Sequence, residues 1–295
     1  MYPLGFTGAE KEAFPAPEPV RHRLRQLAGW LDYAVELGCS GLMLGPIFAA
    51  ETHGYDTIDH FTVDPRLGDQ ADFDHLVAEA GRRGLRIVLD GVFNHVGRSF
   101  PAFQAALAGG PDSPAARWFR RHNGVTPQTF VGNHDVTRLA SQLTDDRHIG
   151  HALAVLFTVA GIPSVYYGDE QAFGGVKETR AGGDDEIRPS VPASPAELPP
   201  DGWPTYRLHQ RLIGFRRRHP WLVRARTSAL HLTNGAIAYR AAADGAEIVV
   251  LLNIGDNDVR FGVDVGDLAV SLAADPGTRP GDPLLVPGHS WVIFG

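Results

Sequence analysis

Four short polar clusters carry the residue types that could do chemistry in this chain of 295 residues. Each follows an apolar run, and the clusters are His53-Gly54-Tyr55-Asp56, Asp90 with Asn94 and His95, Asn133-His134-Asp135 with Arg138, and Gly168-Asp169-Glu170. A single Asp in such a place is usually a turn former or a helix cap, and a single His is usually structural. Together they combine carboxylates, imidazoles and an aromatic ring without lysine, which suits a neutral, hydroxyl-rich ligand such as a sugar.

The motifs of several other chemistries are absent from the sequence. It has no G-x-x-x-x-G-K-[ST] phosphate loop, no G-x-G-x-x-G after a strand and no G-x-S-x-G around a nucleophilic serine. His53, His95 and His134 follow no known zinc spacing. The single cysteine excludes a disulfide framework and a cysteine-based zinc site. We therefore predict no cofactor and no bound metal.

The net charge and the hydropathy pattern limit the partners. A net charge of −7 gives no electrostatic reason to expect binding to nucleic acid or to an anionic membrane. The N-terminal residues lack the basic and apolar regions of a secretory signal. The most apolar stretch, residues 152–159, is too short to span a bilayer. These features predict a cytoplasmic protein.

Alternating strands and helices must position the polar clusters. The patterns predict strands at 41–48, 85–89, 129–131 and 162–167, and helices at 20–38, 71–83, 145–160 and 205–218, with shorter helices near 100–108 and 114–121. Strands that alternate with helices form a parallel sheet, in which all strand C-termini point to one face. We therefore expect the four clusters to share that face. After residue 224, short alternating runs separated by Asn234-Gly235 and Asp244-Gly245 predict an antiparallel β domain.

Four sequence motifs carry a family resemblance. They are HGYD at 53–56, LDGVFNH at 89–95 with the pattern D-x-x-x-N-H, FVGNHD at 130–135 with F-x-x-N-H-D, and GIPSVYYGDE at 161–170 with G-x-P-x-x-Y-Y-G-D-E. In this order they resemble the α-amylase superfamily, glycoside hydrolase family 13, and the resemblance covers essentially the whole chain.

The resemblance implies a fold and roles for individual residues. The family is a (β/α)8 barrel with a C-terminal β-sandwich, and it cleaves or transfers α-glucosidic bonds with retention of configuration. By resemblance, Asp135 stabilises the oxocarbenium-like transition state. His95 and His134 hydrogen-bond the sugar, Tyr55 is its stacking platform, and Asp90 organises the site. The predicted substrate-binding set is Tyr55, Asp90, His95, His134 and Arg138.

Two motifs of that family are missing from the sequence. Retaining hydrolysis needs a nucleophile and a general acid, which the family supplies as an Asp in G-x-R-x-D and a Glu after the next strand. Both belong between Asp90 and Asp135, which are 45 residues apart. One β–α–β unit takes about 30 residues or more, and a full barrel needs roughly 250. We therefore expect an internal deletion of barrel strands four to six, with its junction near residues 118–126.

The expected fold class is α/β, with two domains. Residues 1–223 are expected to form an incomplete (β/α)8 barrel of the TIM type, in which residues 2–6 are the first strand, and residues 224–295 a small antiparallel β-sandwich. Five strands cannot close an eight-stranded barrel. Because open sheet edges invite pairing with another chain, we predict a homo-oligomer formed through those edges.

Four hypotheses about function remain open on the sequence alone. In the first, the chain is a hydrolase-type protein for maltodextrin-type glucans that is inactive without its nucleophile and acid, with an α-glucan or maltooligosaccharide as its ligand. In the second, it is a non-catalytic α-glucan-binding or regulatory protein. In the third, it is a truncated gene product of an active enzyme, and in the fourth a partner chain supplies the missing strands. The sequence does not separate α-1,4 from α-1,6 specificity, or hydrolysis from transfer.

Overall fold

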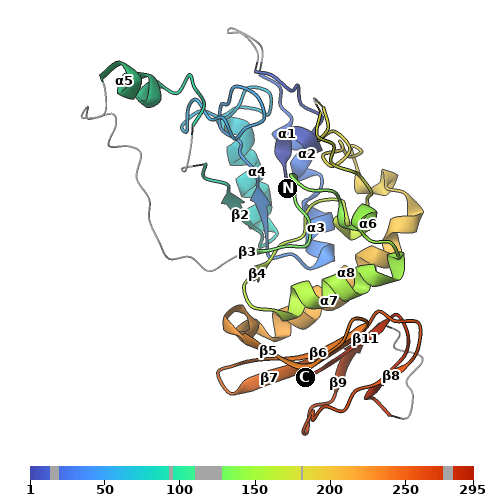
Figure 1. The fold of residues 1–295 in the computed structure, drawn as a ribbon. Helices are drawn as coiled ribbons and strands as arrows, with labels where there is room; N and C mark the ends of the chain where they lie inside the picture. The colour runs from blue at the N-terminus through green and yellow to red at the C-terminus, as the bar shows by residue number, and fades with distance from the viewer. Residues whose placement is uncertain (14–19, 93–95, 110–127, 181, 275–281) are drawn as a thin grey trace. The chain divides into compact units, whose positions relative to one another are not determined.

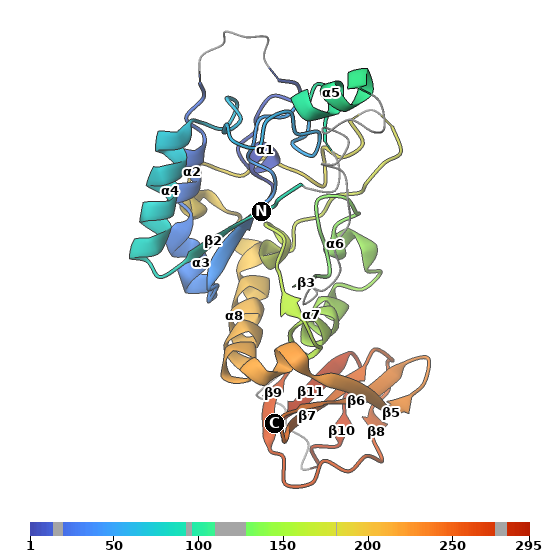
Figure 2. The ribbon, with the colours of Figure 1, turned by 90° about the vertical axis from the view of Figure 1, so that its left-hand side faces the viewer.

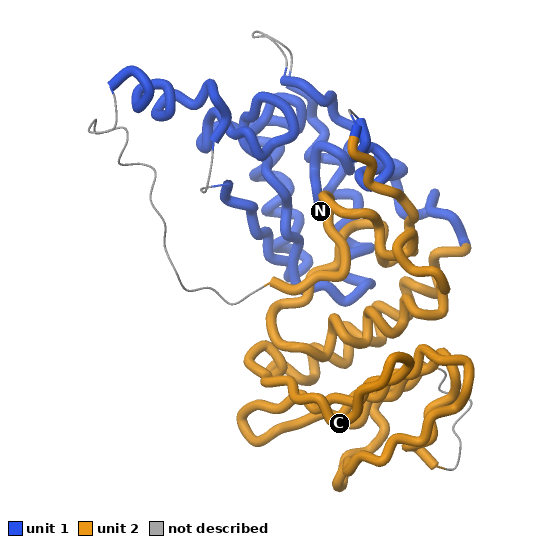
Figure 3. Tube along the Cα trace, viewed as in Figure 1, with its two compact units in different colours: residues 1–124, 180–200 blue, residues 125–179, 201–295 orange. Residues whose placement is uncertain are grey.

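Two compact units make up the structure, a computed structural model that describes residues 1–13, 20–92, 96–109, 128–180, 182–274 and 282–295. Unit 1 comprises residues 1–124 and 180–200, and unit 2 comprises residues 125–179 and 201–295 (Figure 3). The boundary expected at 223/224 does not separate these units, because helices that precede it pack on the C-terminal sheet. As a division between family modules, 1–223 and 224–295 stays a prediction.

Unit 1 is built around a pair of parallel strands. β1 (Gly41–Leu44) pairs with β2 (Arg86–Leu89) in the register Gly41 to Arg86. Its helices are α1 (Pro3–Phe6), α2 (Leu24–Ala28), α3 (Leu31–Leu37), α4 (Gln70–Arg82) and α5 (Pro101–Gly109), with a 3-10 turn η4 (Pro195–Glu197). α2 and α4 lie side by side (Figure 2). The predicted parallel arrangement of these two strands is confirmed.

Helix α4 shows why the prediction for residues 71–83 was accurate. The Asp69 side chain accepts a hydrogen bond from the Asp72 backbone N–H, and the Asp72 side chain accepts one from the Asp69 N–H. This reciprocal capping box satisfies two N–H groups that have no partner within the helix. Leu76 and Ala80, four residues apart, are fully buried. Gly84 then takes a positive φ of 72°, which ends the helical path.

Two predictions for the N-terminal part need correction. Residues 2–6 do not form a strand: Pro3 begins α1, because its fixed φ suits the first turn of a helix. Only Met1 runs beside β1, where its N-terminus donates to Met43 O and its carbonyl accepts from Gly45 N–H. The helix expected at 20–38 is interrupted, and α2 and α3 are separated by two residues, Gly29 and Trp30.

Unit 2 begins with a second pair of parallel strands and two long helices. β3 (Gln128–Thr129) pairs with β4 (Ile162–Pro163). The helical segments are α6 (Leu139–Gln142), η2 (Asp146–His148), α7 (Ile149–Thr158), η3 (Asp169–Gln171), α8 (Trp203–Arg218) and η6 (Pro220–Arg224), while η5 (Pro200–Gly202) lies where the chain enters unit 2. The strand expected at 162–167 is much shorter, because its partner β3 has only two residues. The helix expected near 114–121 lies outside the described residues.

The C-terminal part of unit 2 is an antiparallel sheet, as predicted. Its strands follow the order β5 (Arg226–Leu232), β6 (Ala236–Ala243), β7 (Ala246–Asn253), β11 (Ser290–Phe294) and β9 (Val270–Ala273), and β8 (Val259–Arg260) pairs separately with β10 (Leu285–Val286). Asp244 and Gly245 both have positive φ, which suits the tight turn between β6 and β7. Leu251 and Phe294 from the large sheet share a buried core with Phe261 and Val286.

Helices α7 and α8 lie next to this sheet within unit 2 (Figure 1). Thr158 Oγ1 at the end of α7 lies 2.5 Å from Tyr239 Oη of β6. Arg211 of α8 donates to the carbonyl of Ala273, at the end of β9, over 2.5 Å. These bonds explain why the helices belong to the same compact unit as the sheet. Among the described residues, none of the helices is long and apolar enough to cross a membrane.

Candidate functional site

The first predicted site residues, Tyr55 and Asp90, contact each other in unit 1. Tyr55 Oη donates a hydrogen bond of 3.0 Å to Asp90 Oδ2. Asp90 directly follows β2, and its backbone N–H donates to Leu44 O, which extends the strand pairing by one residue. The carboxylate is therefore held at the C-terminal end of the parallel pair, as the sequence predicted. Both side chains are only partly buried, so they are open to a ligand.

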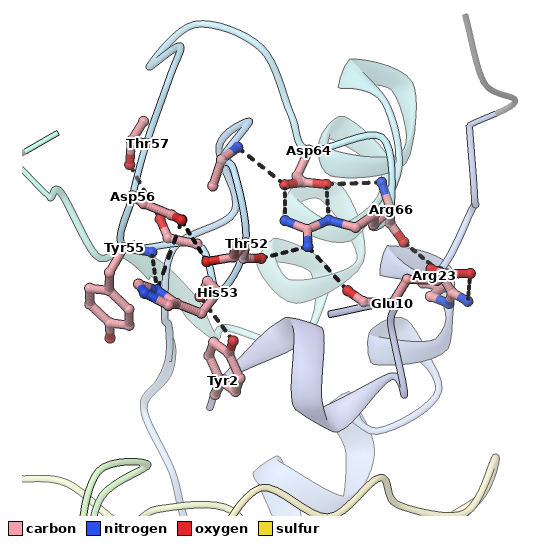
Figure 4. Close-up of polar contacts among 12 residues, drawn as sticks. Tyr2, Glu10, Arg23, Thr52, His53, Tyr55, Asp56, Thr57, Asp64 and Arg66 are labelled. Carbon is pink, nitrogen blue, oxygen red and sulfur yellow. Dashed lines mark hydrogen bonds and ion pairs between the residues drawn. The ribbon is translucent and has the colours of Figure 1, made fainter. Parts of the chain in front are cut away.

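Neighbouring polar groups fix the loop that carries Tyr55 (Figure 4). Thr52 Oγ1 donates to Asp56 Oδ2 over 2.5 Å, and Tyr2 Oη donates to the carbonyl of His53 over 2.9 Å. The Tyr55 backbone N–H donates to His53 Nδ1 over 3.2 Å. Partial burial acts to raise the pKa of Asp56, but the hydrogen bonds from Thr52 outweigh it, and the pKa is lowered. The Asp56 carboxylate is thus ionised at neutral pH and joins the two ends of the turn through its hydrogen bond with Thr52.

The buried side chain of Arg66 also holds the loop that carries Tyr55. Arg66 is fully buried, and its Nε and Nη2 donate to Asp64 Oδ1 and Oδ2 over 2.9 and 2.7 Å. Its Nη1 donates to the backbone carbonyls of Thr52, at 2.5 Å, and Glu10, at 3.1 Å (Figure 4). A buried guanidinium is stable only when its N–H groups have partners. Two of them form a bidentate pair with Asp64, and Nη1 holds the backbone at Thr52, three residues before Tyr55.

Sequence reasoning missed Thr52, Asp64 and Arg66. None of them belongs to a motif, and the D-P-R sequence at 64–66 has the composition of an ordinary turn. The only signal was indirect, since a buried polar group must be paired and nothing in the sequence shows which residues are buried. Another predicted residue, His95, lies outside the described residues together with Asn94.

The remaining predicted residues lie in unit 2, beyond β3. His134 Nε2 lies 3.3 Å from Asp135 Oδ2, and the side chains are 17% and 55% exposed. The Asp135 backbone N–H donates to Asn133 Oδ1 over 2.9 Å, which forms a local turn. This turn presents the Asp135 carboxylate toward solvent beside an imidazole. Such a pair can hydrogen-bond sugar hydroxyls and place negative charge beside a cationic centre.

Arg138, four residues from His134, is buried rather than exposed. Its Nη1 donates to the Tyr167 carbonyl at 2.6 Å and to Asp169 Oδ1 at 3.1 Å. The guanidinium also lies over the Tyr166 ring, 4.3 Å from its centroid. The side chain therefore connects the N-H-D turn with the turn after β4. That Arg138 contacts a substrate stays a prediction. In this structure its hydrogen bonds hold the turn after β4.

The turn after β4 holds the Asp169 side chain in a buried position. Burial raises the pKa of Asp169 to about 6, against the opposing effect of Arg138. Its Oδ2 has no hydrogen-bond partner among the described residues. A Cβ at Gly132 would lie 2.6 Å from this oxygen, so the N-H-D turn packs directly on the carboxylate, which would have to shift for any larger residue at position 132.

The predicted residues thus form two local groups. Tyr55 and Asp90 are in unit 1, and His134, Asp135 and Arg138 are in unit 2. Each group is internally defined by the hydrogen bonds above. That they share one face stays a prediction.

Two clusters of side chains in the described residues have donor atoms close enough for a metal ion: His22 with Asp69 and Asp72, and Asp145 with His148 and His289. The first is a helix cap. Its buried Asp72 carboxylate accepts hydrogen bonds from the Asp69 backbone N–H and from Arg25 Nε, and lies 2.6 Å from His22 Nδ1. Neither cluster contains a predicted site residue.

Comparison with known proteins decides the family. The profile described as "Alpha amylase, catalytic domain" matches residues 23–128 and, in a second stretch, residues 120–231. The chain belongs to the α-amylase family. This confirms the family predicted from the four motifs, and the two stretches together cover all of them.

Relatives of this α-amylase-family chain match it over short segments. The intracellular maltogenic amylase of Bacillus subtilis is 43% identical over 101 residues, which is 34% of this chain and 17% of that protein. Neopullulanase 2 of Thermoactinomyces vulgaris is 48% identical over 106 residues, 36% of this chain and 18% of that protein. The matched segments therefore span less than a fifth of these relatives.

Solved structures show the fold. A trehalulose synthase structure aligns with a TM-score of 0.75 at 14% identity, covering 100% of this chain and 98% of that one. This similarity supports the α/β architecture of the family with a C-terminal antiparallel sheet. At this level of identity it does not extend to activity.

Proposed function

We propose that this chain binds α-glucans through the retained framework of the α-amylase family and does not itself hydrolyse them. One observation carries the proposal: the stretch between Asp90 and Asp135, which are 45 residues apart, contains neither the G-x-R-x-D motif nor the acid motif that follows it in the family. Retaining cleavage needs both carboxylates. When members of a cooperating catalytic set are removed, the rest contribute little to the rate.

The retained residues support binding. An aromatic platform at Tyr55, a fixed carboxylate at Asp90 and the exposed Asp135 beside His134 are groups that recognise sugar rings and hydroxyls. Relatives carry names such as maltogenic amylase and neopullulanase, which fits a glucan ligand. We propose that the predicted residues Tyr55, Asp90, His95, His134, Asp135 and Arg138 act in glucan binding.

Two findings support an internal deletion. The family profile matches in two stretches that meet at residues 120–128, where the junction was predicted near 118–126. Parallel strands are normally covered on both faces, yet Val88 of β2 is 51% exposed and Ile162 of β4 is 52% exposed. Such exposure fits strands that have lost neighbours. We therefore propose an incomplete barrel that has lost its fourth to sixth strands, in a cytoplasmic protein, as the name of the Bacillus relative suggests.

Two assays on the purified chain test the proposal. Incubation with maltotriose and with p-nitrophenyl α-glucoside is expected to give no release of product above the rate without protein. Titration calorimetry with maltose is expected to show binding at millimolar ligand, weakened in Tyr55→Ala. Phe61→Ala is the matched control, because Phe61 is an aromatic residue of unit 1 that is 89% exposed.

The two parts of the proposal, lack of hydrolysis and binding of glucan, can be rejected separately. The proposal that the chain is inactive is contradicted if the wild type turns over either substrate and Asp135→Ala abolishes this turnover. The control Asp201→Ala should then leave the turnover unchanged. Asp201 is an exposed carboxylate of the same unit and serves as the control. No heat of binding at millimolar maltose contradicts the binding role.

The alternative is a truncated gene product of an active enzyme. It is favoured by the same observation, the meeting of two profile stretches at 120–128. Sequencing the locus across codons 118–126 decides between them. An uninterrupted reading frame identical to this chain supports a natural deletion, and additional codons there support the truncated product.

A further inference from the structure

Two histidines and a carboxylate converge in unit 2, away from the predicted site residues. His148 ends η2, just before α7, and His289 lies in the turn before β11, 141 residues later in the chain. His148 Nε2 lies 3.0 Å from His289 Nδ1. Asp145 Oδ2 lies 3.8 Å from His289 Nδ1. The donor atoms of all three residues lie within 4.8 Å of one another.

The tautomer of His289 directs one ring nitrogen into this cluster. His289 Nε2 lies 2.8 Å from Asp256 Oδ1. Because a carboxylate only accepts hydrogen bonds, Nε2 carries the proton and donates it. In the neutral ring, Nδ1 then accepts a hydrogen bond from His148 Nε2–H. A metal ion bound to both nitrogens takes the place of this proton, which is released to solvent. A histidine whose second nitrogen donates to a carboxylate is the usual arrangement of a metal ligand and its supporting partner.

The backbone also fixes His289 in this orientation. Its N–H donates to the carbonyl of Gly255 over 3.1 Å, and its φ of 55° lies in the left-handed region, which few non-glycine residues adopt. The ring stacks on that of His148 with an interplanar angle of 22° and a centroid distance of 5.2 Å. The side chain is only 13% exposed. The imidazole is therefore held in place before any ligand arrives.

We propose that Asp145, His148 and His289 form a binding site for a divalent first-row transition metal such as Zn²⁺, with Asp256 orienting His289. Two imidazoles and one carboxylate are a ligand set that zinc commonly takes, with a fourth position left for water. Two nitrogens about 2.05 Å from one tetrahedral zinc lie about 3.4 Å apart. The observed 3.0 Å needs to widen by only a few tenths of an ångström.

The charges around the cluster both favour and oppose a cation. Asp145 supplies a carboxylate, whose oxygens accept hydrogen bonds from Arg147 Nε and Nη2. Arg147 itself competes, since its Nη2 lies 2.6 Å from Asp145 Oδ2. Metal binding must displace this contact.

Cobalt and zinc titrations of the full, untagged chain test the site. After removal of metals with a chelator, one equivalent of Co²⁺ is expected to give the visible absorption bands of a four-coordinate ion, which Zn²⁺ then abolishes. His148→Ala and His289→Asn are expected to weaken binding at least tenfold. Asparagine is chosen at position 289 because it tolerates a positive φ. His231→Gln, on β5 of the same unit, is the control and is expected to leave the affinity unchanged.

Two further variants keep the test decisive if those substitutions impair folding. Asp256→Asn, at a side chain that is 92% exposed, is expected to weaken binding about 10- to 100-fold through the orientation of His289. Arg147→Ala is expected to strengthen binding by removing the competing cation. Absence of a cobalt band, or an affinity that none of the four variants changes, overturns the proposal.

Discussion

Tyr55 Oη donates a hydrogen bond of 3.0 Å to Asp90 Oδ2, and this contact joins the loop after β1 to the C-terminal end of β2. The two residues are 35 positions apart in the sequence, but the parallel pairing of β1 with β2 brings them together. Tyr55, the predicted sugar platform, is thereby tied to a carboxylate that follows the next strand. The hydrogen bond makes one group out of two separately predicted residues.

Removing this hydrogen bond is expected to cost little stability. Tyr55→Phe keeps the ring and removes the hydroxyl, so the free energy of unfolding should fall by about 0.5–1.5 kcal/mol. Asp90 is partly exposed, so water can replace the lost donor. Urea unfolding followed by circular dichroism measures the change. A loss as large as that expected on breaking a buried ion pair would mean that the contact also holds the loop.

The buried pair Arg66–Asp64 is expected to be far more important for stability. Arg66→Met leaves the Asp64 carboxylate buried without its partner, which should lower the free energy of unfolding by about 3–5 kcal/mol. Lys11→Ala, which breaks an ion pair in the same unit, is the control. Its side chain and that of Asp185 are 72% and 60% exposed, so the expected change is about 0–1 kcal/mol. Equal losses in the two variants would contradict the anchoring role of Arg66.

The carboxyl of Asp169 is expected to make stability depend on pH in an unusual direction. Its pKa is raised from 3.8 to about 6 by burial, so the folded state binds a proton that the unfolded state releases between these values. Its contribution is therefore fully present below pH 3.8 and is lost as the pH rises through about 6.

The comparison with Asp169→Asn isolates this effect. Other groups, such as His209 with a pKa lowered to about 4 by burial, titrate in the same window with the opposite sign. They are common to both proteins and cancel in the difference. The stability of the wild type relative to the variant should fall from pH 4 to pH 6, as measured by urea unfolding. A difference that rises over this range would show that Arg138 lowers the Asp169 pKa instead.

Exposed apolar side chains on the parallel strands predict self-association. Val88 of β2 is 51% exposed, and a strand with such a surface tends to pair with another chain unless a charge prevents it. Val88→Glu should therefore shift the protein toward monomer in light scattering. Val77→Glu on α4, where the valine is 41% exposed, is the control and should leave the mass unchanged. A wild-type protein that is a monodisperse monomer would contradict this prediction.

The sequence by itself determined the family, the parallel strands β1 and β2, the helix α4 and the antiparallel C-terminal sheet. These features depend on local patterns: alternation, the Asp69 cap and the turn at Asp244-Gly245. It also determined which side chains could do chemistry, because Asp90, His134 and Asp135 lie in motifs with fixed spacing.

Only the tertiary structure decided which polar groups are buried and what they contact. It placed Arg138 beneath the site against Asp169, selected the Arg66–Asp64 anchor of the Tyr55 loop, and brought His148 to His289 across 141 residues. It also turned residues 3–6 into a helix in place of a strand. The physical reason is common to these cases. Burial and long-range pairing depend on residues distant in the chain, whereas the patterns in a sequence report only on neighbours.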